Sequence, residues 1–147
     1  MEKLPPIGKI YEAYSALADG RVKLSDSDSR AEVASSDGSR HYTITWDGQH
    51  YTSNDSATFW AGYPGYPVLA VWMKQGILPC NMEIAKLFRD VNWNARNKEY
   101  KRHYDKAVAA VIAERQLDAD RIEADVRAVY EAVKALNLTV SRGKGRP

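Results

Sequence analysis

The chain has 147 residues, of which 44% are hydrophobic and 27% charged, and its net charge at pH 7 is +2. This length fits one folded domain with a hydrophobic core, and so small a net charge does not by itself indicate a nucleic-acid-binding protein. The single cysteine, Cys80, excludes an intramolecular disulfide and a zinc ribbon and favours a cytoplasmic location. The longest apolar run, 68–73, is far shorter than the roughly 20 residues of a membrane-spanning helix, so no membrane association is expected.

Residues 7–18 are predicted to form the first helix. Apolar side chains recur there at spacings of three or four residues, and Gly20 follows where a C-terminal cap is expected. The period of the apolar pattern then changes to two. Residues 22–24 can supply one strand of a sheet that continues through residues 31–54.

Two Asp-Gly pairs divide this sheet into an antiparallel meander: Asp37-Gly38 and Asp47-Gly48. Such pairs favour two-residue hairpins, because a type I′ turn requires a positive φ at both central positions. The first turn would pair Val33 with Tyr42, and the second would pair Ile44 with Tyr51. These registers place the apolar side chains on one face and leave the other face mainly polar.

Residues 56–82 carry a single charge, Lys74, and five of them are aromatic. We expect this apolar hub to form the joint core between the sheet and the later helices, because both must bury their apolar faces. Pro67 suits the first turn of a helix that continues over 68–75. The loop 63–67 is the part least expected to be fully buried, since its two phenol groups need hydrogen-bond partners or water.

Three more helices are predicted after the hub, over residues 81–88, about 93 to 116, and from 118 or 120 onward. The last two would form an antiparallel hairpin, because the connection between them is short. Residues 141–147 have no apolar residue except the final proline, and we expect them to be a disordered basic tail.

The predicted fold class is therefore α+β, with one domain over residues 1–140. An N-terminal helix and a three- or four-stranded antiparallel meander occupy residues 1–55. The apolar hub occupies 56–82, and a C-terminal helical half occupies 83–140.

Basic residues gather on one side of the long predicted helix and in the tail. Those on the helix are Arg96, Lys98, Lys101, Arg102 and Lys106, and those in the tail are Arg142, Lys144 and Arg146. Residues 81–92 followed by a basic helix also have the outline of a helix-turn-helix. The leading hypothesis is a non-enzymatic module that binds a macromolecule, either nucleic acid or an acidic protein surface, through these side chains. An ordinary solvated helix face is the simpler interpretation.

The second hypothesis is a pocket that binds a small ligand or carries an enzymatic site, between the sheet and the Tyr63–Tyr66 loop. Its candidate rim residues are His41, His50, Asn54, Tyr63 and Tyr66. No zinc-ligand spacing, nucleophile motif, phosphate loop or dinucleotide fingerprint is present, so no catalytic residue, metal ligand or cofactor is predicted. A third possibility is an adaptor subunit whose last two helices form a homo-oligomer seam.

Overall fold

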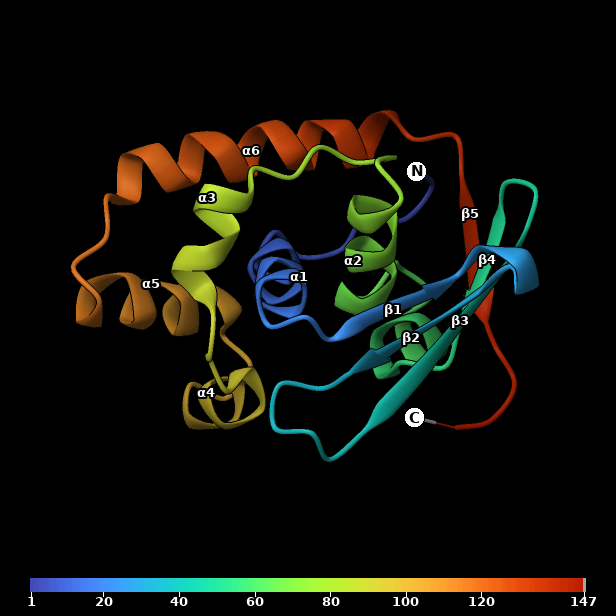
Figure 1. Cartoon of the computed structure of the whole chain (residues 1–147). Coiled ribbons are helices and arrows are strands. Elements are labelled where there is room, and N and C mark those ends of the chain that lie inside the picture. Colours follow the sequence, from blue (N-terminus) through green and yellow to red (C-terminus); the bar gives the residue numbers. More distant parts are fainter. Residues whose placement is uncertain (147) are drawn as a thin grey trace.

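A sheet of five strands lies beside a group of helices in the computed structural model, which describes residues 1–146 (Figure 1). Strands β1 to β5 follow one another across the sheet in chain order. β1 to β4 form an antiparallel meander, and β5 runs parallel to β4. Their bounds are Val22–Ser25, Arg30–Ala34, His41–Asp47, His50–Ser53 and Thr139–Arg142. The predicted α+β fold class is confirmed, with five strands in place of the three or four expected.

The helices α1 to α6 span Gly8–Ala18, Tyr66–Lys74, Met82–Ala85, Trp93–Glu99, Tyr104–Glu114 and Ala119–Ala135. Three shorter helical turns are η1 (Asp26–Asp28), η2 (Ala57–Ala61) and η3 (Lys86–Phe88). Among residues 1–146, none of the helices is long and apolar enough to span a membrane.

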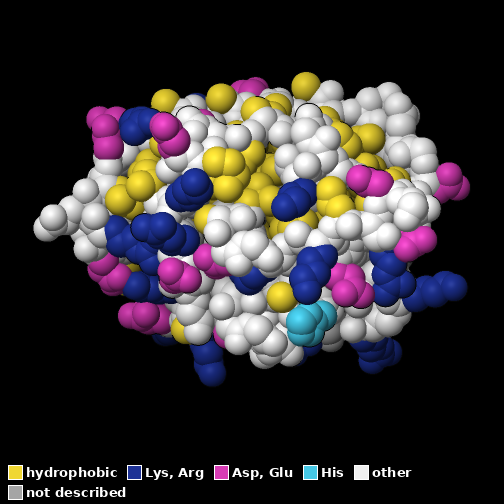
Figure 2. All heavy atoms as spheres, viewed as in Figure 1, with side chains coloured by type: hydrophobic (Ala, Val, Ile, Leu, Met, Phe, Trp, Pro, Cys, Tyr) yellow, Lys and Arg dark blue, Asp and Glu magenta, His cyan; other side chains and the backbone are white. Residues whose placement is uncertain are grey.

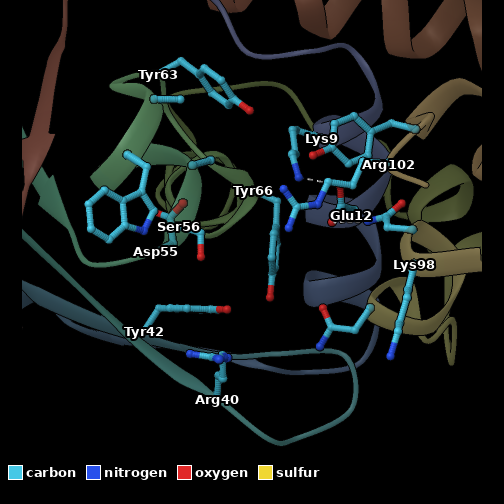
Figure 3. A pocket seen from close by; sticks show the side chains of 16 residues that line it. Lys9, Glu12, Arg40, Tyr42, Asp55, Ser56, Tyr63, Tyr66, Lys98 and Arg102 are labelled. Atoms are coloured by element: carbon cyan, nitrogen blue, oxygen red, sulfur yellow. Dashed lines mark hydrogen bonds and ion pairs between the residues drawn. The ribbon is translucent and has the colours of Figure 1, made fainter. Parts of the chain in front are cut away.

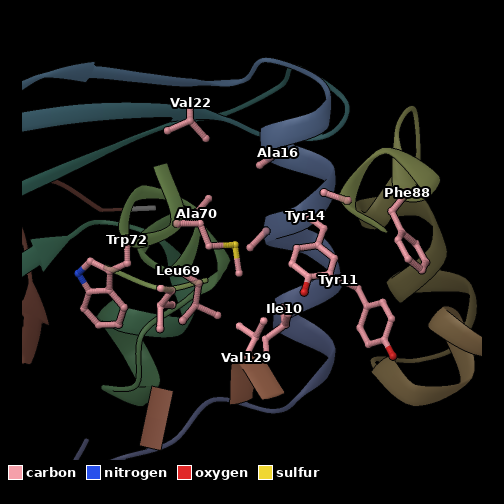
Figure 4. Close-up of a cluster of buried hydrophobic side chains, with 14 of the residues drawn as sticks. Ile10, Tyr11, Tyr14, Ala16, Val22, Leu69, Ala70, Trp72, Phe88 and Val129 are labelled. Atoms are coloured by element: carbon pink, nitrogen blue, oxygen red, sulfur yellow. The ribbon is translucent and has the colours of Figure 1, made fainter. Parts of the chain in front are cut away.

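Helix α1 lies at the centre of the fold, with α2 on one side and α3, α5 and α6 around the other (Figure 1). Its residues 8–16 are all buried, so its apolar stripe is wider than an amphipathic surface helix requires. In Figure 4, Ile10 faces α2 and α6, while Tyr11 packs edge-on against Phe88 with the ring centroids 5.1 Å apart. As predicted, Gly20 follows the C-terminal end of the helix, where it has a φ of +66° and donates its N–H to the Leu17 carbonyl.

A buried hydroxyl ties α1 to the helices that follow the hub. The Ser15 hydroxyl donates to the Phe88 carbonyl at 2.5 Å and accepts the Trp93 indole N–H at 2.7 Å. Both bonds are buried, so each satisfies a polar group that would otherwise cost about 1–3 kcal/mol. These contacts hold the beginning of α4 against α1.

The two predicted hairpins differ in outcome. The register of the first is correct. In the second, Ile44 pairs with Ser53 and not with Tyr51. The turn lies at Gly48-Gln49, and only Gly48 has a positive φ, of 58°, as in a type II′ turn. Because the pairing shifts by two positions, the same side chains still face the core.

The single long helix predicted over residues 93–116 is wrong. α4 ends at Glu99, and α5 begins at Tyr104. Lys101 and Arg102, which lie between them, have φ values of 52° and 64°. This left-handed conformation cannot continue a right-handed helix. The expected basic stripe is therefore divided between two helices and a turn.

Contacts with α1 explain this break. Trp93 bonds to Ser15, and Tyr104 packs so closely on Gly8 that a Cβ at Gly8 would lie 2.7 Å from the Tyr104 Cβ. Trp93 and Tyr104 would be about 16 Å apart along a straight helix, but their partners on α1, Ser15 and Gly8, are only about 10 Å apart. A straight helix therefore could not make both contacts. The reversal of the chain after α4 allows both contacts to form.

The prediction that the tail from residue 141 is disordered is wrong for Ser141 and Arg142, which complete β5. Gly143 continues the pairing by donating its N–H to the Ser53 carbonyl at 2.9 Å. β4 would otherwise be an edge strand with unpaired backbone groups, and the returning chain satisfies them. Pro147, the last residue of the predicted tail, lies outside the described residues.

Candidate functional site

A cavity of about 860 Å³ opens between the sheet and the helices, on the side where the chain enters α2 (Figure 3). Side chains from α1, the beginning of β3, η2, the loop into α2, α4 and the α4–α5 turn line it. These segments are far apart in sequence and meet only in the folded chain. The cavity lies between the sheet and the Tyr63–Tyr66 loop, where the second hypothesis expected one.

A buried ion pair on α1 forms part of the wall. Lys9 and Glu12 are 8% and 5% exposed, and the Lys9 Nζ lies 3.2 Å from Glu12 Oε2. Asn97 of α4 donates its side-chain amide to Glu12 Oε1 at 3.3 Å. The ammonium of Lys9 also lies 4.2 Å from the centre of the Tyr104 ring, which is a cation–π geometry.

Burial and pairing act in opposite directions on the pKa values of these two groups. Burial raises the pKa of the Glu12 carboxyl, and the charge of Lys9 opposes the rise. Burial disfavours the charged form of Lys9, but the nearby Glu12 and Tyr104 outweigh it and raise the pKa of Lys9. The ammonium is therefore held in its charged form inside the cavity wall.

The wall formed by η2 is arranged around a second buried carboxylate, Asp55. Its Oδ1 accepts the Ser53 hydroxyl at 2.5 Å, and its Oδ2 accepts the Thr58 N–H at 3.1 Å, which caps η2. The Gly65 N–H in turn donates to the Thr58 hydroxyl at 3.1 Å. A Cβ at Gly65 would lie only 1.9 Å from Asp55 Oδ2, so this close approach of loop and carboxylate requires glycine.

Aromatic rings supply most of the apolar surface of the cavity. Tyr42 and Tyr66 meet edge to face with their ring centroids 6.3 Å apart. Burial raises the pKa of both phenols and also that of Tyr63, so all three remain neutral donors at physiological pH. Trp60 also lines the cavity, and 65% of it is exposed.

Three cationic side chains on the cavity wall have no acidic partner. Arg40 follows the first hairpin turn, Lys98 is on α4, and Arg102 is in the α4–α5 turn. Within residues 1–146, none of the three forms a salt bridge. The two acids of the wall, Glu12 and Asp55, are already bonded to protein groups. The cavity therefore carries a positive charge that the described part of the protein does not neutralise.

Of the five rim residues proposed from the sequence, the cavity contains Tyr63 and Tyr66. His41 is exposed and is not part of the lining. The His50 ring is held by the hydroxyls of β5, at 2.6 and 2.9 Å. Asn54 accepts the Thr43 N–H with its side chain at 2.9 Å. The polar face of the sheet thus points away from the cavity.

The basic residues proposed from the sequence are similarly divided. Lys98 and Arg102 line the cavity, whereas Lys101 and Lys106 are exposed outside it. The Arg96 guanidinium bonds to both carboxylate oxygens of Glu114, one of them at 2.7 Å.

The three basic residues near the C-terminus lie in or after β5, which packs beside η2. The Arg142 guanidinium lies 4.9 Å from the centre of the Phe59 ring, and Lys144 and Arg146 follow it as exposed residues. On the face seen in Figure 2, Lys and Arg side chains stand in separate groups interspersed with Asp and Glu. The basic residues therefore do not form one continuous stripe on that face.

Sequence reasoning missed most of the polar lining: Lys9, Glu12, Arg40, Asn94 and Asn97. One signal was present, because Lys9 and Glu12 lie three positions apart in a helix that is otherwise mainly small and apolar. Charges at that spacing in a fully buried helix must be paired. The other residues become neighbours only in the folded chain.

Within the described residues 1–146, no three His, Cys, Asp or Glu side chains come together as metal ligands would. A protein-family model with the description "Uncharacterised conserved protein UCP014422" matches residues 2–139. No curated protein and no solved structure matches the chain.

Proposed function

Since this chain belongs to the family described as Uncharacterised conserved protein UCP014422, a description that gives no activity, we propose its function from the cavity. The protein binds a small organic anion between α1, η2 and α4. The observation that carries the proposal is the group of three cationic side chains, Arg40, Lys98 and Arg102, which face one cavity without an acidic partner among the described residues.

The charge balance of the lining supports an anion and not a neutral ligand. Lys9 balances the charge of Glu12, whereas the partners of Asp55 are neutral donors, so Asp55 offsets one of the three remaining cations and the lining keeps an excess of positive charge. A hydrogen bond that involves a charged group contributes about 1.5–3 kcal/mol, so two such bonds give about 3–6 kcal/mol, which corresponds to a Kd between about 6 mM and about 40 μM. Guanidinium groups also match the planar geometry of carboxylates and phosphates.

The size and surface of the cavity support a ligand of metabolite size. Its volume of about 860 Å³ lies within the range of roughly 300–1,000 Å³ that is usual for small-molecule sites. Tyrosine rings and a tryptophan provide apolar surface, and the side-chain amides of Asn94 and Asn97 provide polar groups that can orient a ligand.

Binding of nucleic acid through the basic residues stays a prediction, and the fold offers it less support. That hypothesis relied on one continuous basic helix, and α4 and α5 are separate helices. The remaining basic side chains lie in or after β5, which packs beside η2, so they do not extend a basic helix.

Titration with inorganic phosphate, followed by amide chemical shifts at low ionic strength, tests the proposal. Shifts are expected at α4, the α4–α5 turn and η2. The Arg40→Ala/Lys98→Ala double variant is expected to weaken binding about tenfold, which corresponds to the loss of about 1.4 kcal/mol. A matched control with the same charge change, Lys23→Ala/Lys106→Ala, should bind phosphate as the wild type does, because neither residue lines the cavity. Shifts elsewhere only, or equal weakening in both variants, would refute the proposal.

A further inference from the structure

Trp60 is an unusual residue for the edge of a cavity. It is 65% exposed, whereas Trp72 and Trp93 are 0% and 2% exposed. Single exposed apolar side chains are common on protein surfaces, so the exposure of Trp60 matters here because the ring lines a cavity and because tryptophan is frequently a central contact in binding sites. The exposed indole is therefore the most available apolar surface in the lining.

The local backbone holds this ring in place. Trp60 belongs to η2, a five-residue π-helical turn that ends at Gly62 with a φ of +77°. Turns of this kind are rare and occur frequently at functional sites. The Phe59 ring packs edge-on against the indole with the centroids 4.6 Å apart, and Phe59 itself lies beneath the Arg142 guanidinium. The indole is thus supported from behind and is not a freely rotating side chain.

The cavity has two chemically different sides. In Figure 3, Lys98 and Arg102 come from the α4 side, and Ser56 and Tyr63 come from η2 and the loop on the opposite side. Trp60 belongs to this second side by its position in η2. A ligand that uses the whole cavity therefore needs an anionic group at one end and a flat, mainly apolar group at the other.

We infer that the ligand is a mononucleotide, whose phosphate contacts Lys98 and Arg102 and whose base stacks on Trp60. A phosphate is favoured over a carboxylate because it can be dianionic at neutral pH and three cations face the cavity. A heterocyclic base is favoured over a plain phenyl ring because hydroxyl groups, those of Ser56 and Tyr63, line the same side of the cavity as Trp60. This inference rests on the proposed anion-binding function.

Calorimetric titrations with adenosine monophosphate and with ribose 5-phosphate distinguish anion binding alone from anion binding with a base stacked on Trp60. The wild type is expected to bind adenosine monophosphate about tenfold more tightly than ribose 5-phosphate, since stacking of one base on an aromatic side chain contributes about 1–3 kcal/mol, which corresponds to about 5- to 160-fold. Trp60→Ala should remove this difference and leave the affinity for ribose 5-phosphate unchanged, and Trp60→Phe should restore part of it. Ile77→Ala, at an exposed apolar residue outside the cavity, should change neither affinity.

The possible failures are distinguishable. Equal affinities for both ligands in the wild type, or the same tenfold preference in Trp60→Ala, would overturn the base-stacking inference while the anion site stands. Failure of both ligands and of inorganic phosphate to bind would overturn the proposed function as well. Tighter binding of a short 5′-phosphorylated DNA strand than of adenosine monophosphate would indicate a nucleic-acid end and would overturn the assignment to a free mononucleotide.

Discussion

Replacing Glu12 by glutamine is the change that most directly tests the buried ion pair in the cavity wall. The side chains of Lys9 and Glu12 are 11% and 6% exposed, and their charged atoms are 3.2 Å apart. At an effective dielectric constant of about 20, this separation corresponds to an attraction of about 5 kcal/mol. The loss of hydration offsets much of this attraction, so the net contribution of the intact pair to the free energy of unfolding is smaller.

The single and double variants are expected to differ strongly in stability. Glu12→Gln leaves the Lys9 ammonium buried without an opposite charge, and this should lower the free energy of unfolding by about 3–5 kcal/mol. The double variant Lys9→Met/Glu12→Gln removes both charges, so most of the lost stability should return. Urea denaturation followed by tryptophan fluorescence measures each value, and the resulting double-mutant cycle gives the coupling energy.

The variant Lys9→Met adds a pH test. Burial raises the pKa of Glu12, and in this variant no ammonium opposes the rise. A carboxyl whose folded-state pKa exceeds its unfolded value binds a proton on folding, so its favourable contribution is fully present below the unfolded pKa and is lost as the pH rises through the folded pKa. Lys9→Met should therefore be relatively more stable at pH 5 than at pH 7, and the double variant should not share this dependence.

Two results would refute this reasoning. If Glu12→Gln lowers the free energy of unfolding by less than about 1 kcal/mol, the pair is more hydrated than its burial indicates. If the double variant loses as much as the two single variants combined, the charges do not interact, and the contacts of their aliphatic parts would account for the stability.

Two further predictions concern the cavity loop and the single thiol. Gly65→Ala should lower the free energy of unfolding by about 3 kcal/mol, because the new Cβ would lie 1.9 Å from Asp55 Oδ2. The control Ser56→Ala, at an exposed residue of the same cavity wall, should lower it by less than about 0.5 kcal/mol in the same urea titration. Equal losses in the two variants would contradict the close approach of Gly65 to Asp55. Burial, followed by the charge of Asp125, raises the pKa of the Cys80 thiol to about 11, so at pH 8 its thiolate fraction is about 100-fold lower than that of a thiol at the ordinary value of 9.0. Because the more basic thiolate is also more nucleophilic, its reaction with a disulfide reagent should be about 10-fold slower. A reaction rate that is already constant above pH 9 would contradict this pKa.

Several elements could be predicted because their signals are local. α1, α2 and α6 follow from apolar spacing together with Gly20, Pro67 and Asp118 at their ends, and Asp118 does accept the Arg121 N–H. The second hairpin shows the limit of such signals. Asp47-Gly48 correctly indicated a tight turn, but its glycine fits two turn types whose registers differ by two residues.

The candidate site could be predicted only in part. Its aromatic loop was visible as a proline- and glycine-rich segment with two phenols, and Lys98 and Arg102 were visible as basic residues, although on a helix that proved to be broken. Arg40 carried no signal, because it resembles an ordinary polar residue at the end of a strand, and Asp55 stood out only as a polar residue that could cap the helical turn after it or contribute to a pocket. Their importance depends entirely on what lies opposite them in space.

The sequence by itself determined the fold class, the helices α1, α2 and α6, the first hairpin and the apolar segment 56–82. These features depend on side-chain periodicity and turn chemistry over a few residues. Only the tertiary structure decided the rest. The break between α4 and α5, the pairing of β5 with β4 and the cavity itself all arise from contacts between distant parts of the chain. The physical reason is that packing around the buried α1 overrides local helix preference and brings unpaired cations together with an exposed tryptophan.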